Sequence, residues 1–499
     1  MTGDGPGGVG EGAQDHSAEG KALRGVPWTL AAFTLSRGLQ LVGTLIIARL
    51  VAPSEIGVVL TGLVVIGALN LLSDNGLSIT LVVRDRIDER LVGTVFTMML
   101  GIAVCGAVAA AALAGPISTV FGEPELADVL PLLALTVITS TISWLLTNLL
   151  QREMLWRARF AGQFALAVGY VVVAVPAAAL GAGIWSLVIG QIAAGVLATA
   201  VLWRAYPKPF RPQFHRREAR IAFTESRPYV SQSVTAFFIE NLHFIAVSAF
   251  LGAHAMALYS MSFRLSELPN KGLAQPVAEA TLPAYVALRH DAQRGTTALL
   301  TALRYVTLAA FLPLAILAAT APDFISVILG PRWTEMEPIL LLLCVWGALA
   351  VPAGTLNWFV NAGGGARYMA VTNLVRLFGI APLIFFAAAV LESLTAVGVF
   401  MCVDVLVELG MISAYAHRRL SLPFRAAART VALPCVAAAA ALAAGIGARV
   451  GLEHVAAVPG LGRLALSLLA AALAYVGVVA LLSPATLRDG RALARRAVG

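Results

Sequence analysis

The chain has 499 residues, of which 59% are hydrophobic and 12% are charged, with 35 lysines and arginines against 27 aspartates and glutamates. This composition and a mean hydropathy of +0.84 lie far outside the range of soluble globular proteins and predict an integral membrane protein. The net charge of +8 does not indicate a nucleic-acid partner, because the basic residues are spread over short connectors and form no single patch.

The first twenty residues are polar and rich in glycine, without the basic start and apolar core of a cleaved signal peptide. We therefore expect residues 1–24 to be a disordered cytoplasmic tail. About fourteen apolar stretches follow, each long enough to cross a bilayer, which takes about 20 residues of helix. The expected spans are 28–48, 57–76, 92–114, 129–150, 162–182, 185–203, 229–251, 256–286, 298–320, 337–359, 369–390, 394–414, 431–450 and 464–482.

The connectors between these spans alternate in their content of arginine. Every second connector is basic, and together these hold about 26 of the 35 lysines and arginines. Basic connectors stay on the cytoplasmic side of a membrane, so the alternation predicts an even number of spans with both termini in the cytoplasm. We expect a multi-pass membrane protein.

The longest and most basic connector, 204–228, divides the spans into two blocks of six. The sequence thus predicts an all-α polytopic membrane protein with two six-helix lobes, related by a pseudo-two-fold axis, plus two C-terminal helices. The expected parts are an N-lobe at 25–203, a basic cytoplasmic linker at 204–228, a C-lobe at 229–416, and two extra spans with a basic tail at 417–499.

Ionisable residues inside the spans are the main clue to function, because a charge at the centre of a bilayer costs at least about 2.5 kcal/mol. Cations facing a water-filled cavity suit an anionic substrate, and the fork of arginine matches the geometry of phosphate. The candidates for substrate binding are Arg37, Gln40, Arg264, Lys271 and Arg376. The candidates for gating or ion coupling are Asp74, Glu240, Glu267, Asp404 and Glu408.

The same charges can instead pair inside the protein and only hold helices together. Glu267 and Lys271 have the spacing of an i,i+4 ion pair, and Arg376 can meet Asp404 across neighbouring helices. His243 is expected to be a polar residue with a satisfied partner rather than a proton relay.

Several motifs are missing from the sequence. It contains no GxxxxGK[ST] phosphate loop, no Cys/His metal cluster and no nucleophile elbow. We therefore expect a transporter rather than an enzyme, without a bound cofactor, whose energy source is a proton or sodium gradient.

A resemblance rests on motifs in a fixed order. Ser36-Arg37 with Ala48–Gly57 resembles the opening signature of the polysaccharide (O-antigen-type) flippases, and Asp74–Leu77 resembles the Asp-x-Gly-Leu element that follows it. Gln151-Arg152, Gly183–Val188 and Leu329–Trp333 are similar to later motifs of the same family. The resemblance covers about residues 28–420.

This resemblance implies the fold of the multidrug/oligosaccharidyl-lipid/polysaccharide exporter superfamily and transport by alternating access. It implies flipping of undecaprenyl-pyrophosphate-linked oligosaccharide between leaflets for lipopolysaccharide or exopolysaccharide export. The implied partners are this lipid-linked oligosaccharide, membrane lipids, and a polysaccharide polymerase with its export machinery. A lipid II flippase and a cation-coupled multidrug antiporter of the same superfamily remain as alternatives.

Overall fold

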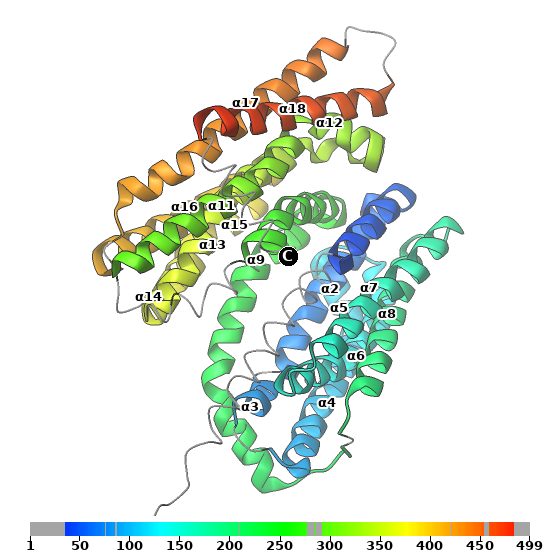
Figure 1. Cartoon of the computed structure of the whole chain (residues 1–499). Coiled ribbons are helices and arrows are strands. Elements are labelled where there is room, and N and C mark those ends of the chain that lie inside the picture. The colour runs from blue at the N-terminus through cyan, green and yellow to red at the C-terminus, as the bar shows by residue number, and fades with distance from the viewer. Residues whose placement is uncertain are drawn as a thin grey trace, which may run out of the picture. The chain divides into compact units, whose positions relative to one another are not determined.

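The computed structural model describes residues 35–74, 76–84, 87–208, 210–275, 277, 285, 292–420, 422–453 and 459–483. These residues form helices joined by short connectors, and no strand occurs among them (Figure 1). Twelve helices in the described ranges are long and apolar enough to cross a membrane. The predicted tail 1–24, most of 276–291 and the basic residues 484–499 lie outside these ranges.

The chain forms two compact units. The N-terminal unit comprises the chain up to Val51 and residues Gly62–Phe237, and the C-terminal unit comprises Ala52–Thr61 and the chain from Phe238 onward. The first unit contains a helix over 35–50, most of α2 (Pro53–Asp74), α3 (Leu77–Val83), α4 (Glu89–Ala112), α5 (Ala114–Phe121), α6 (Leu126–Arg152), α7 (Trp156–Ala179), α8 (Ile184–Ala205) and the start of α9 (Arg216–Pro269).

The predicted linker 204–228 is only partly a loop, because α9 begins at Arg216. Phe210 is buried among aromatic rings, with ring centroids 5.3 Å from Phe96 and 5.4 Å from Trp203. Ala222 belongs to the leucine-rich core that α3, α4 and α6 share. A helix forms here because the segment has an apolar side to bury, and the basic residues occupy its other sides.

Helix α9 continues into the C-terminal unit and folds back on itself at Gly252. This glycine has φ 80° and ψ 179°, a conformation that side chains with a Cβ rarely adopt. The hydroxyl of Tyr259 lies 3.0 Å from Nδ1 of His243, although a straight helix holds residues 16 apart about 24 Å from each other. The two halves are therefore antiparallel neighbours.

This turn reconciles the expected and observed numbers of spans. The apolar stretch Ser233–Ala274 has 42 residues, about 63 Å of helix and twice the thickness of a bilayer core. Gly252 divides it into pieces of about 28 and 33 Å, so it provides two crossings, as predicted for 229–251 and 256–286. The twelve helical stretches then contain thirteen crossings, and the helix over 35–50 covers part of the first expected span.

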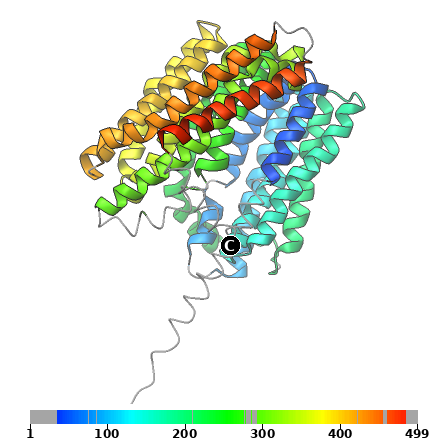
Figure 2. The same ribbon diagram turned by 45° about the horizontal axis from the view of Figure 1, so that its top comes forward.

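The rest of the C-terminal unit contains η1 (Asn270–Ala274), α11 (Ala292–Ala319), α12 (Ala321–Phe324), η3 (Ile325–Leu329), η4 (Pro331–Met336), α13 (Glu337–Ala362), α14 (Ala366–Val375), η5 (Arg376–Ile380), α15 (Ala381–Ala389), α16 (Leu394–Leu420), α17 (Phe424–Glu453) and α18 (Gly460–Leu482). The last two helices run side by side in both views (Figures 1 and 2) and share an alanine-rich core with α11. The hydroxyl of Tyr475 donates to the carbonyl of Leu308 at 2.8 Å, and Arg463 forms an ion pair with Asp323 at 2.8 Å. These contacts fasten the two extra helices to the C-terminal unit.

Candidate functional site

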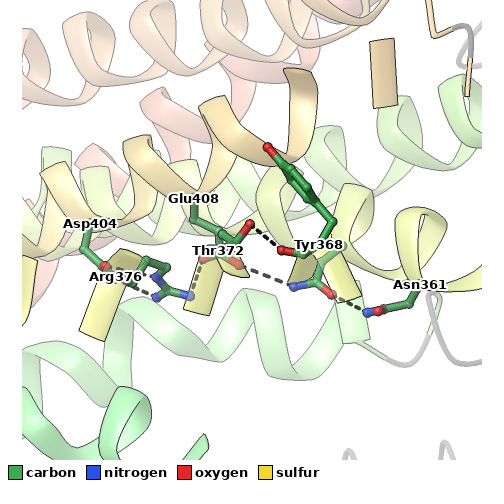
Figure 3. A network of polar contacts seen from close by, with 7 residues as sticks. Asn361, Tyr368, Thr372, Arg376, Asp404 and Glu408 are labelled. Carbon is green, nitrogen blue, oxygen red and sulfur yellow. Dashed lines mark hydrogen bonds and ion pairs between the residues drawn. The ribbon is translucent and has the colours of Figure 1, made fainter. Parts of the chain in front are cut away.

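A network of polar side chains lies among three membrane-spanning elements of the C-terminal unit (Figure 3). One of these elements is the predicted span 369–390, in which α14, η5 and α15 follow one another as a single helical stretch. Its middle part, η5, is a π-helical turn that begins at Arg376. π-helical turns inside α-helices are rare and occur often at functional sites. The other two elements are α13 and α16.

Arg376 is at the centre of the network. Its Nε donates to Oδ1 of Asp404 at 2.9 Å and its Nη2 donates to Oδ2 at 2.6 Å, a bidentate pair. Its Nη1 lies 3.0 Å from Oε2 of Glu408. The three side chains are only 12–15% exposed. The predicted contact between Arg376 and Asp404 is thus confirmed, and the guanidinium is directed at carboxylates.

A hydrogen-bonded chain leads from this cluster toward the end of α13. Nδ2 of Asn357 donates to Oε1 of Glu408 at 3.4 Å, and Nδ2 of Asn361 donates to Oδ1 of Asn357 at 2.7 Å. Asn361 is exposed and lies one residue before the end of α13. This series of hydrogen bonds therefore connects the largely buried carboxylate of Glu408 with an exposed side chain at a helix terminus.

Tyr368 and Thr372 complete the group: Tyr368 joins α14 to α16, and Thr372 bonds to the preceding turn of α14. The hydroxyl of Tyr368 donates to the carbonyl of Met411 at 3.0 Å, and the hydroxyl of Thr372 donates to the carbonyl of Tyr368 at 3.2 Å. The sequence did not single out these residues or the two asparagines. The one available signal was the i,i+4 spacing of Asn357 and Asn361 in an otherwise apolar helix.

The charges of the network do not cancel when both carboxylates are ionised. One guanidinium then faces two carboxylates, which leaves one negative charge in a region flanked by apolar helices. A buried excess charge is costly unless a cation or a proton compensates it. Such an arrangement can hold helices together, and it can also bind and release a proton or a cation.

A second cluster links the two halves of the α9 hairpin. Nζ of Lys271 lies 2.9 Å from Oε2 of Glu267, so the predicted i,i+4 pair is present. Both charges act electrostatically on Glu240, which the fold-back at Gly252 brings near them from the first half of α9. Arg264, one turn before Glu267, is exposed.

His243 has a satisfied partner, as expected, in the hydroxyl of Tyr259. His243 is buried, and the centroids of its ring and the ring of Phe263 are 4.9 Å apart. The ring of Phe263 in turn lies 4.7 Å from that of Trp346 on α13. This aromatic group packs the hairpin against α13.

The remaining predicted site residues belong to the N-terminal unit or to its boundary. Arg37 is exposed on the helix over 35–50, and the carbonyl of Gln40 on the same helix accepts a hydrogen bond from Thr44 at 2.8 Å. Asp74 is the last residue of α2, and the structure describes its backbone but not its side chain. Nη1 of Arg152 donates to the carbonyl of Leu81 at 2.8 Å, so it supplies a hydrogen-bond partner to a carbonyl in the last turn of α3.

The chain is similar to known proteins of polysaccharide biosynthesis. A family model described as "Polysaccharide biosynthesis protein" matches residues 46–338. The succinoglycan biosynthesis transport protein ExoT of Rhizobium meliloti is 25% identical over 401 residues, which cover 80% of this chain and 81% of ExoT. The lipopolysaccharide biosynthesis protein WzxC of Escherichia coli is 22% identical and covers 73% of this chain and 74% of WzxC.

Among solved structures, the chain is similar to the lipid II flippase MurJ in an inward closed conformation. The TM-score is 0.74 at 12% sequence identity, and the match covers 92% of this chain and 99% of MurJ. At this identity the similarity establishes the fold. The expected all-α polytopic fold is therefore confirmed.

Proposed function

The chain belongs to the polysaccharide biosynthesis protein family, and from that premise we propose that it is a flippase for undecaprenyl-pyrophosphate-linked oligosaccharide. It would move the sugar head group from the inner to the outer leaflet for surface polysaccharide export. The observation that carries this proposal is the alignment with ExoT, which extends over four-fifths of both chains. The similarity thus extends over most of the chain and is not confined to one motif.

The charges of the membrane helices support an anionic substrate. Arg37 and Arg264 are both exposed, the first on the helix over 35–50 and the second on the second half of α9. A cation on a membrane helix is costly, and such residues usually face an aqueous cavity or a polar ligand. Arginine forms paired hydrogen bonds with phosphate oxygens, so a pyrophosphate group is a suitable ligand. Gln40 and Lys271 complete the proposed set of substrate-binding residues. Arg376 is left out of it, because all three nitrogens of its guanidinium face Asp404 and Glu408.

Alternating access is the mechanism that we propose. Transporters built from two repeats expose one site to each side of the membrane by rocking one body against the other. The division of this chain into two compact units supplies two such bodies. Asp74, Glu240 and Glu267 are proposed as gating residues because they are acidic residues of the membrane helices.

The driving energy is proposed to come from a proton or sodium gradient. The Arg376–Asp404–Glu408 cluster supports this role, because one guanidinium faces two carboxylates and one negative charge is left over when both are ionised. Occupation by a cation, or protonation of a carboxylate, would neutralise the cluster and change the contact of η5 with α16. The coupling residues in this proposal are Asp404 and Glu408.

The proposed location is the bacterial inner membrane, with both termini in the cytoplasm, because the basic connectors alternate along the chain. The lipid-linked product would pass to a polysaccharide polymerase and its export machinery.

Two experiments test the function. Deletion of the protein in its host should stop surface polysaccharide and cause lipid-linked oligosaccharide to accumulate on the cytoplasmic side. Purified protein in proteoliposomes should make undecaprenyl-pyrophosphate-linked glycan in the inner leaflet accessible to an external lectin. Flipping of lipid II in place of the glycan, or altered drug sensitivity without accumulated lipid intermediate, would favour one of the two alternatives.

A further inference from the structure

A groove of about 1240 Å³ runs along α11 in the C-terminal unit. Residues of α11 from Gln293 to Ala309 form one wall, and Leu273 and Val277 form part of the other. Leu273 and Val277 are each 40% exposed. The groove is separate from the Arg376 network, because none of the residues that line it belongs to that network.

The α11 wall of the groove consists of a polar stripe and an apolar stripe that run side by side along the helix. Arg294, Thr297, Thr301 and Tyr305 follow one another at spacings of three and four, so they form one stripe on the helix. Small apolar residues form the adjacent stripe: Ala298, Ala302, Val306 and Ala309. An amphiphile lying along α11 would therefore meet polar groups on one side and hydrocarbon on the other.

The polar stripe reaches the middle of the candidate membrane span. Arg294 is in the first turn of α11, and Tyr305 lies about 16 Å further along the helix axis, near the middle of the candidate span Gln293–Ala319. A resident phospholipid has only acyl chain at that depth, which offers no partner to hydroxyl groups. A polar head group in transit would meet these hydroxyls in succession.

The threonine hydroxyls are able to accept hydrogen bonds from such a head group. Thr297 donates its hydroxyl hydrogen to the carbonyl of Gln293 at 2.9 Å, and Thr301 donates to the carbonyl of Thr297 at 2.8 Å. Each hydroxyl oxygen keeps lone pairs, and both side chains are exposed. Sugar hydroxyls are donors that match these acceptors.

We propose that this groove is an entry site for the head group of the lipid-linked saccharide. Arg294 binds a phosphate, the hydroxyls of Thr297, Thr301 and Tyr305 bind sugar, and the polyprenyl chain lies on Leu273 and Val277. The inference rests on the proposed function, because it assumes a substrate with these three chemical parts. It adds a binding site along α11 of the C-terminal unit, apart from the charged residues assigned above.

The test measures lipid binding directly, without transport. Purified protein is titrated with undecaprenyl pyrophosphate, and with the same lipid bearing one N-acetylglucosamine, while bound lipid is counted by native mass spectrometry. We expect Arg294→Gln to weaken the binding of both probes by about ten-fold, as for loss of one charge-assisted contact. Thr301→Val should weaken only the sugar-bearing probe. Arg367→Gln, an exposed arginine of α14 outside the groove, is the matched control and should bind as wild type.

The outcomes separate this inference from the proposed function. Wild-type binding that persists unchanged in both groove variants, or that phosphatidylglycerol displaces equally well, overturns the entry site and leaves the flippase function standing. A folded wild-type protein that binds neither probe contradicts the flippase function itself. Thermal unfolding of each variant excludes misfolding as the cause, and Thr301→Val provides the answer if Arg294→Gln does not fold.

Discussion

Arg376 meets Asp404 through two hydrogen bonds at once, from Nε to Oδ1 at 2.9 Å and from Nη2 to Oδ2 at 2.6 Å. With Nη1 3.0 Å from Glu408, every nitrogen of the guanidinium faces a carboxylate. This geometry joins η5 to α16 at a point where the side chains are nearly buried. Both the stability and the proposed energy coupling of the C-terminal unit therefore depend on this arginine.

Arg376→Ala should destabilise the protein strongly. The substitution leaves two carboxylates facing each other without their cation, and loss of one partner from a buried ion pair costs about 3–5 kcal/mol. Thermal unfolding in detergent, followed by tryptophan fluorescence, should show a lower midpoint than for wild type. Arg367→Ala removes an exposed arginine from the same unit and should leave the midpoint unchanged. Equal midpoints for the two variants would contradict the structural role of the pair.

Glu408→Gln should uncouple transport without unfolding the protein. Glutamine has the shape of glutamate and can still accept a hydrogen bond from Arg376, but it removes the excess negative charge. We expect flipping by wild type in proteoliposomes to accelerate when a proton or sodium gradient is imposed, and flipping by the variant to be insensitive to both. Equal acceleration of both proteins would exclude Glu408 as the coupling residue.

Arg37→Ala and Arg264→Ala should each abolish surface polysaccharide while the amount of protein in the membrane stays normal. Both arginines are exposed, so their loss would remove a proposed phosphate ligand without opening a core. Replacement by lysine should be only partly tolerated, since lysine cannot form the paired contact. Polysaccharide is quantified on whole cells and protein by immunoblot. Normal export in both alanine variants would refute the cationic binding site.

Gly57→Ala should destabilise the C-terminal unit. A Cβ on Gly57 would lie 1.8 Å from the carbonyl oxygen of Ala253, so α2 could not approach the turn of the α9 hairpin. The hydrogen bond from Ser248 to Thr61, at 2.7 Å in the same contact, would be lost as the helices separate. Gly101→Ala is the matched control, because a Cβ there meets nothing within 4 Å. A melting midpoint equal to that of the control would disprove the close approach.

The membrane spans were predictable because length and hydropathy are sufficient to define them. The expected spans 92–114 and 394–414, for example, correspond to α4 and α16. The break between the expected spans 229–251 and 256–286 is confirmed by the turn at Gly252. The φ of 80° at this glycine was not predictable, because a glycine in an apolar stretch does not reveal its backbone conformation. The helical start of α9 was also missed, since the many basic residues of 204–228 suggested a solvated loop.

The charged part of the site was easier to predict than its uncharged part. An arginine and an aspartate in neighbouring apolar spans must find partners, so the contact of Arg376 with Asp404 followed from charge alone. Asn357 and Tyr368 carry no charge and lie on different helices, so their participation depended on packing that the sequence does not specify. Whether Arg37, Gln40, Arg264 and Lys271 bind substrate stays a prediction.

The hairpin of α9 also bears on how the chain enters the membrane during synthesis. Two crossings are joined there at Gly252, with no hydrophilic loop between Ser233 and Ala274 to be carried through the hydrocarbon. Such a pair can insert as one unit, with the turn leading and the backbone hydrogen bonds already formed within each helix. Lengthening the turn by a charged peptide would convert a concerted insertion into two sequential ones, and the insertion machinery would then have to translocate polar residues.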